Sequence, residues 1–217
     1  MTVTFSNVIL GPPKLITYVG SATGFGTSSA VVNKPAGQWT KGNLLIAFCA
    51  IDDGSRAAPS ITGTGWSSIG LTSTYLSSSV WCKFAGASEP ASVTFTDVTP
   101  PNSTVAAIIE YTNVTFCVSN IVFEGAPPIT FSSITSTKAY SLGITAILAV
   151  DNVTDTVGTS TGYTNRISVQ ATGSGSGYNG GIWVADSQIA SPSRTTPSAP
   201  TATGSMALAA YSILLQQ

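Results

Sequence analysis

The chain has 217 residues, of which 8% are charged, and it contains no histidine. Eight Lys and Arg stand against nine Asp and Glu, so the clustered positive charge that binds nucleic acid is missing. Catalysis that uses imidazole as its base is excluded, as are zinc sites that contain histidine. The apolar stretches are also too short to cross a membrane.

Short runs rich in Val, Ile, Thr and aromatic residues, bounded by Gly, Pro, Asn and Ser, dominate the sequence and predict strands. The stretch Gly143–Asp151 has the composition of a buried helix, but its length and the flanking Thr and Asn residues favour a strand. The predicted strands are, in chain order, Val3–Leu10, Leu15–Val19, Ser29–Val32, Leu44–Ile51, Trp66–Ile69, Thr74–Phe84, Ser92–Thr96, Val105–Tyr111, Phe116–Phe123, Ser141–Val150, Asn165–Gln170, Gly181–Gln188 and Met206–Leu215.

Two kinds of apolar pattern occur among these strands. Ser92–Thr96 alternates apolar and hydroxyl residues, whereas Leu44–Ile51 is apolar throughout. A continuous apolar run fits a strand that is covered on both faces, by an opposing sheet and by loops or a neighbouring subunit. The chain is therefore predicted to be all-β, a jelly-roll-like β-sandwich with additional hidden surface.

The sequence echoes itself at a spacing of about 100 residues. Leu45–Asp52 resembles Ile144–Asp151, and Val80–Cys82 resembles Ile182–Val184 in the same order. The echo predicts two similar halves. We expect these halves to interleave in one sandwich, as strands do in a jelly roll, and two tandem domains are the alternative.

The domain boundaries follow from the echo. The two halves are placed at residues 42–123 and 139–217. Residues 34–217 are assigned to the sandwich, because no linker separates the halves. Residues 1–33 precede the echoed unit, and we expect them to form added edge strands or an arm that grips a partner.

The cysteines Cys49, Cys82 and Cys117 are odd in number, and each lies in an apolar, strand-like run. We expect three buried, reduced thiols that behave as small apolar side chains. One disulfide with one free cysteine is the alternative.

Aromatic residues stand at echoed positions, namely Trp66, Trp81, Tyr163 and Trp183. They suit a sandwich core better than a platform for stacking sugars. Trp39 is different, because it lies in a turn-rich stretch and is expected to be exposed.

Partner contacts are expected in two segments. One is the turn-rich stretch, and the other is the Pro-rich stretch 191–203, which fits a surface loop or an extended edge segment. The candidate contact residues are Trp39, Lys41, Pro192, Pro197 and Pro200.

The carboxylate residues give only weak indications of a calcium site or an acid–base pair. Asp52 and Asp53 follow one predicted strand and Asp151 and Asp155 lie at the end of another; such clusters could hold calcium, but they occur more often in plain turns. Glu89 and Glu110 could serve as an acid–base pair only if the fold brought them together. No catalytic, cofactor-binding or metal residue is predicted, and we expect no enzyme activity.

The surface must be covered largely by Ser, Thr, Asn and Gly, because charged residues are so few. Soluble monomers carry about 25–35% charge on their surface, and charge is also the usual guard on sheet edges. We therefore expect much of the surface to be buried in a homo-oligomer or against a larger lattice.

Several segments resemble a β-sandwich module of tailed-bacteriophage virion proteins and some bacterial surface proteins. They are Gly42–Phe48, Gly65-Trp66, Ser79–Ala85, Ser88–Pro90, Val93–Thr96 and Ala106–Tyr111. Asn43 replaces the usual Asp, and Cys82 stands where an aromatic is common. The resemblance covers the first half well and the second loosely, and it carries no catalytic motif.

The resemblance implies a virion structural protein. We expect a capsid cement or decoration protein on the outer surface of a phage head, assembled in the host cytoplasm, since no secretory signal is visible at the start of the chain. Its partners would be the major capsid protein or other virion proteins and copies of itself, with a trimer favoured. The alternatives are a tail-fibre, baseplate or head-fibre component that binds host glycans, and a carbohydrate-binding module of a bacterial surface protein.

Overall fold

The computed structural model describes residues 14–51, 58–72, 76–97, 103–125, 128–151, 156–172, 179–203 and 207–217. In these ranges the chain forms strands and turns without a helix, which confirms the predicted all-β sandwich. The same ranges hold no helix that is long and apolar enough to cross a membrane.

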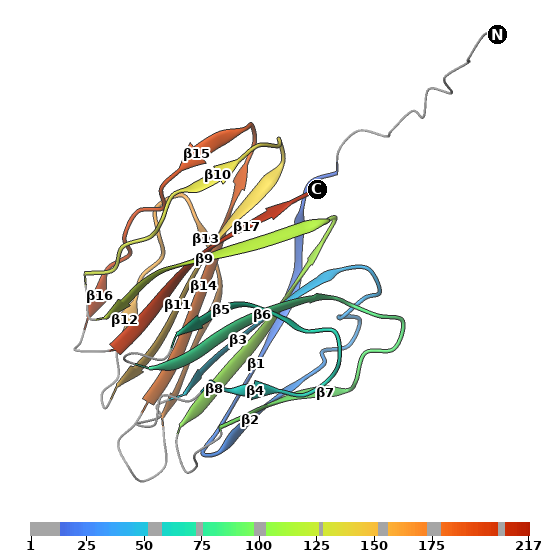
Figure 1. The fold of residues 1–217 in the computed structure, drawn as a ribbon, viewed down its shortest axis with the longest axis vertical. Coiled ribbons are helices and arrows are strands. Elements are labelled where there is room, and N and C mark those ends of the chain that lie inside the picture. Colours follow the sequence, from blue (N-terminus) through green and yellow to red (C-terminus); the bar gives the residue numbers. More distant parts are fainter. Residues whose placement is uncertain are drawn as a thin grey trace, which may run out of the picture.

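Two five-stranded antiparallel sheets pack face to face and form the body of the molecule (Figure 1). The strand order is β1-β8-β3-β6-β5 in the first sheet and β13-β14-β11-β17-β9 in the second. The strand bounds in the first sheet are β1 Thr17–Gly26, β3 Leu44–Ile51, β5 Ser67–Thr72, β6 Ser77–Phe84 and β8 Thr104–Thr112. In the second they are β9 Phe116–Gly125, β11 Ser141–Asp151, β13 Thr164–Thr172, β14 Asn179–Ile189 and β17 Ala207–Gln216.

Each sheet is built from one half of the chain. The first sheet uses strands between residues 17 and 112, and the second uses strands between 116 and 216. Read from β9, the second sheet repeats the order of the first, so the echoed strands β3 and β11 lie at the two centres. The halves therefore lie face to face. Contrary to our expectation, their strands do not interleave within a sheet. Strands that are near in sequence pair with each other more readily than distant ones.

Individual residues follow the same correspondence. Gly65 and Gly162 occupy echoed positions, and both have left-handed backbone, with φ of 85° and 79°. Trp81 of β6 and Trp183 of β14 are both 8% exposed, and each packs on the outer face of its own sheet. The predicted core role of these two tryptophans is confirmed, whereas Trp66 and Tyr163 are only half-buried.

Short strands cover the outer face of each sheet. A three-stranded layer of β2 (Ser29–Asn33), β7 (Ser92–Thr96) and β4 (Ser60–Ile61) lies over the first sheet. Over the second lie the pairs β10–β15 and β12–β16, with the bounds β10 Ile134–Ser136, β12 Thr156–Val157, β15 Ser193–Thr195 and β16 Ala202–Thr203. Every residue of β3 is therefore buried by the chain itself. The continuous apolar runs need no neighbouring subunit to cover them.

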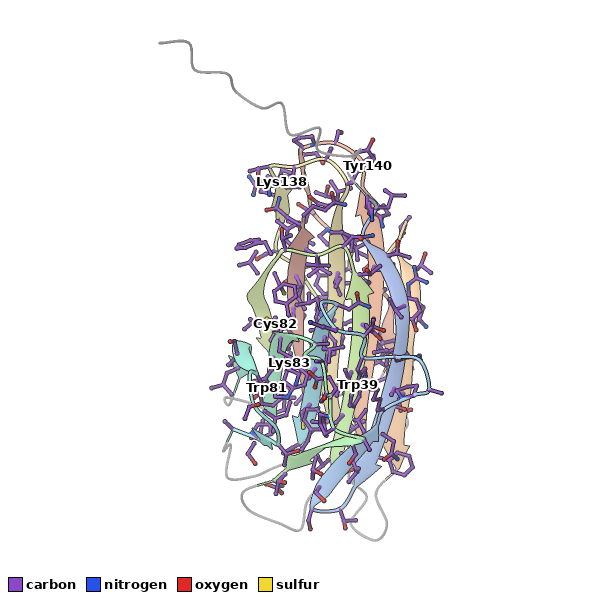
Figure 2. All side chains as sticks on the ribbon, turned by 90° about the vertical axis from the view of Figure 1, so that its right-hand side faces the viewer. Trp39, Trp81, Cys82, Lys83, Lys138 and Tyr140 are labelled. Atoms are coloured by element: carbon purple, nitrogen blue, oxygen red, sulfur yellow. The ribbon has the colours of Figure 1, made fainter. Side chains whose placement is uncertain are left out.

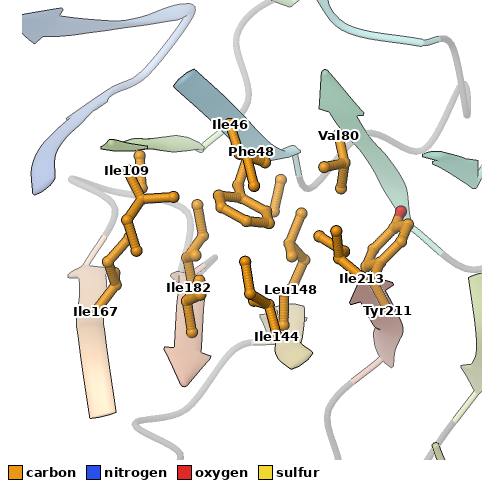
Figure 3. Packing of buried hydrophobic residues seen from close by; sticks show 14 of the residues in the cluster. Ile46, Phe48, Val80, Ile109, Ile144, Leu148, Ile167, Ile182, Tyr211 and Ile213 are labelled. Atoms are coloured by element: carbon orange, nitrogen blue, oxygen red, sulfur yellow. The ribbon is translucent and has the colours of Figure 1, made fainter. Parts of the chain in front are cut away.

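The main core lies between the two sheets and draws on both halves (Figure 3). Phe48 and Ile109 of the first sheet face Leu148 and Ile182 of the second in this layer. Each buried side chain of this size contributes about 1.5–3 kcal/mol, so the two sheets stabilise each other.

The N-terminal segment belongs to the sandwich where the structure describes it. β1 pairs with β8 along its length, and β2 pairs with β7 in the outer layer. The segment thus provides an edge strand, while the strand predicted at Val3–Leu10 lies outside the described residues.

Candidate functional site

Trp39 is buried, with 3% of its surface exposed, so its predicted exposure was wrong. Its indole joins the cluster between the first sheet and its outer layer, and Figure 2 shows it within the body of the molecule. Its backbone is left-handed, with a φ of 56°. Trp39 cannot serve as a contact for a partner without opening this cluster.

Glu110 of β8 explains the position of Trp39. Its carboxylate is fully buried on the outer face of the first sheet. It accepts hydrogen bonds from the backbone N–H groups of Trp39 and Thr40, at 2.7 and 2.8 Å, and from Asn43 Nδ2 at 2.7 Å. Three donors and complete burial make Glu110 the anchor of this loop, with no access for a substrate.

Glu89 is engaged elsewhere. Its carboxylate forms an ion pair with Lys83 at 2.5 Å, and the two side chains are 5% and 7% exposed. Burial raises the pKa of Glu89, but the hydrogen bonds from Lys83 and from the Gly86 N–H outweigh it and hold the pKa below its usual value. The Lys83 ammonium also lies 5.0 Å from the ring centre of Trp66. Glu89 and Glu110 therefore hold separate loops and form no acid–base pair.

The remaining predicted contacts divide into two groups. Lys41 and Pro192 are exposed, as a contact residue requires. Pro197 and Pro200 are buried, so the prediction that these two residues lie at the surface was wrong. The Pro-rich stretch folds back on the second half, where the Gly158 N–H donates to the Thr201 carbonyl.

A charged network joins the two sheets at the side where β1 lies over β13. Asp186 Oδ2 accepts hydrogen bonds from Tyr111 Oη at 2.8 Å and from Arg166 Nε at 2.9 Å. The Arg166 guanidinium also lies over the ring of Tyr18. Burial, followed by the charge of Asp186, raises the pKa of Tyr111 well above its usual value. The network ties β8 and β1 to β13 and β14, and its acidic and basic groups satisfy each other.

The opposite side of the interface carries a neutral counterpart. The Tyr211 hydroxyl of β17 shares a hydrogen bond of 2.6 Å with the Ser78 hydroxyl of β6. β17 corresponds to β8 and β6 to β14, so each half sends a tyrosine from the same strand to the same strand of the other half.

The cavity that the described residues form on the second sheet is small. It lies on the outer face of the sheet, is lined by Phe131, Ile147, Trp183 and Pro200 among others, and has a volume of about 10 Å³. Ligand sites usually measure about 300–1,000 Å³, whereas this volume holds about one water molecule.

The described part of the chain contains three free thiols and no cluster of metal ligands. Among the described residues no group of three or more Cys, Asp or Glu side chains is placed to hold a metal. The side chains of the aspartates considered for calcium lie outside the described residues. All three cysteines are free thiols; Cys49 is buried, while Cys82 and Cys117 are half-buried.

Among the described residues, five of the nine exposed large apolar side chains lie on edge strands of the two main sheets. These are Val19 and Phe25 of β1, Leu71 of β5, and Phe116 and Val118 of β9, which are 38–68% exposed. Together the four edge strands β1, β5, β9 and β13 contain only two charged residues, Glu124 and Arg166. We define these four strands and their exposed apolar side chains as the edge surface.

The edge surface has one built-in protection. Each of the four edge strands is interrupted by a register shift, for example between Ser68 and Gly70 in β5 and between Asn165 and Ile167 in β13. Such bulges disturb pairing with a further strand. The edge surface therefore suits contacts through side chains and short strand segments, and not open-ended sheet growth.

Comparison with known proteins assigns the chain to no family. No family model, no curated protein and no solved structure matches it. The resemblance to phage virion modules accordingly rests on the sequence segments named above.

Proposed function

We propose that this chain is a structural protein of a virus particle, a decoration protein that binds the outer surface of a tailed-phage head. It acts by adhesion to the shell protein and to copies of itself, and it catalyses no reaction. Trimers would suit the local three-fold positions of such a shell.

The observation that carries the proposal is the edge surface. A free soluble protein usually guards exposed edges with charge, and these edges contain almost none. Exposed Phe116 and Val118 lie side by side on one such edge. An uncharged partner surface, such as a protein shell, would cover these groups without burying unpaired charge.

Two further observations support an adhesive role over an enzymatic one. The buried carboxylates Glu89, Glu110 and Asp186 are all engaged by donors of the chain itself. The cavity described above is too small for a substrate. The glycan-binding alternative would use exposed aromatics such as Trp39 together with Asn/Asp-rich loops, and the burial of Trp39 removes one of these supports.

The first test is the copy number in purified particles. Mass spectrometry would quantify this chain against the most abundant shell protein. We expect a ratio near one or a simple fraction of it. A ratio of a few per cent would contradict the head location and indicate the tail, and absence from particles would overturn the viral proposal.

A second test targets the edge surface directly. Val118→Lys places a charge on β9 at a side chain that is already 39% exposed, so the fold should tolerate it. We expect this variant to lose binding to particles that lack the protein. Thr135→Lys, at an exposed position of β10, is the matched control and should bind normally. Equal binding by both variants would remove β9 from the contact.

A further inference from the structure

Cys82 and Cys117 come from different halves and face each other across the main core. Cys82 of β6 is paired with Ile46, and Cys117 of β9 is paired with Leu215. Paired residues of neighbouring antiparallel strands point to the same face. Since Ile46 and Leu215 are both core residues between the sheets, both thiols point inward, and both pack against that core.

The two thiols are also in contact. Their side chains lie close enough to share a hydrogen bond. The sheets approach closely on this side, because a Cβ added to Gly70 of β5 would lie 2.6 Å from the ring of Tyr211 in β17. Disulfides can connect the two sheets of a β-sandwich when paired cysteines face each other in this way.

The two thiols differ in reactivity. The hydrogen bond with Cys117 lowers the pKa of Cys82, which favours the nucleophilic thiolate. The same bond, together with burial, raises the pKa of Cys117. Cys82 and Cys117 are half-buried, whereas Cys49 is fully buried and burial raises its pKa.

We propose that Cys82 and Cys117 form a redox-active pair that closes to an inter-sheet disulfide when the protein meets a small-molecule disulfide such as oxidised glutathione. The Cys82 thiolate attacks one sulfur of the reagent, which forms a mixed disulfide and releases one glutathione thiolate. Cys117 then loses its proton to solvent and attacks the Cys82 sulfur, which releases the second glutathione.

The reaction balances in atoms and electrons. The protein loses two protons and two electrons, and the reagent gains both to become two glutathione thiols. The product would link β6 to β9, and therefore the first half of the chain to the second. This link would form independently of any virion role, so it does not depend on the proposed function.

The test is thiol mapping of the full chain before and after incubation with oxidised glutathione under native conditions. We expect one intramolecular disulfide, a protein lighter by two hydrogens, and a Cys82–Cys117 peptide in the digest, with Cys49 still free. The midpoint of thermal unfolding should rise by roughly 5–15 °C. Both thiols remaining free, or a disulfide that involves Cys49 or a second chain, would overturn the proposal.

Single variants test the order of the two steps. Cys117→Ser should stop the reaction at the mixed disulfide, with one glutathione on Cys82. Cys82→Ser should leave Cys117 unmodified over the same time. Glutathione on Cys117 but not on Cys82 would refute the assigned order, and the mapping of the unaltered chain stands even if a variant does not fold.

Discussion

Replacement of Glu110 by glutamine should destabilise the protein far more than a change of one atom suggests. The carboxylate accepts three hydrogen bonds while fully buried. In Glu110→Gln, one oxygen becomes an NH₂ group, so at least one of the three donors then faces another donor. A bond to a charged acceptor contributes about 1.5–3 kcal/mol, and an unpaired buried donor costs about 1–3 kcal/mol. We expect the free energy of unfolding to fall by about 2–4 kcal/mol.

Urea unfolding measures this loss, and hydrogen exchange at the Trp39 and Thr40 amides locates it. For a chain of this size the midpoint of thermal unfolding should fall by roughly 5–15 °C, and both amides should exchange faster. Asn43→Ala is the matched control, because it removes one partly buried donor and leaves the carboxylate with its two backbone donors; it should cost about 1.5 kcal/mol, the lower end for a bond to a charged acceptor. If Glu110→Gln cost no more than this control, the anchoring role of Glu110 would be refuted.

Two further predictions concern buried polar groups. Tyr111→Phe removes a bond to a charged acceptor and Tyr211→Phe a bond to a neutral hydroxyl, at equal burial. In urea unfolding, the free energy of unfolding should fall by about 1.5–3 kcal/mol for Tyr111→Phe and by about 0.5–1.5 kcal/mol for Tyr211→Phe. A larger loss for Tyr211→Phe would contradict the role of the charged network. The pKa of Glu89 is lower in the folded than in the unfolded chain, so its stabilisation is present above about pH 4.5 and is lost as the pH falls through the folded pKa. Thermal unfolding between pH 3 and 7 should therefore be flatter for Glu89→Gln, and parallel curves would disprove this contribution.

The strands with clean boundaries could be predicted from sequence alone. Leu44–Ile51 and Ser92–Thr96 were predicted with the bounds that the structure has. Both are short runs of β-forming residues, and both follow turn-forming residues. The predicted β1 was too short, because it continues through glycines to Gly26. Gly24 lies against the backbone of β2, where an added Cβ would come within 2.1 Å of the Val31 carbonyl oxygen, so its role there is close approach and not strand termination.

The features that the sequence did not reveal depend on residues far apart in the chain. The turn-rich segment around Trp39 looks exposed, but a carboxylate 71 residues away, Glu110, fixes it against the core. Cys82 and Cys117 lie on different sheets, and only the register of β6 and β9 brings them together. Local patterns describe which face of a strand is buried. They do not describe which buried side chain meets which.

The shared inner face decides whether the two halves can exist apart. Each half covers the outer face of its own sheet with short strands, but the inner faces cover only each other. The segment 113–217 alone would expose core residues such as Leu148 and Ile182 to water. Because the two sheets have equivalent strand orders, the isolated half should pair with a second copy of itself, inner face to inner face. Sedimentation of this segment should show a folded dimer and an unfolded monomer, and Leu148→Asp should abolish the dimer. A monomeric segment that unfolds cooperatively would show that the halves do not depend on a common core.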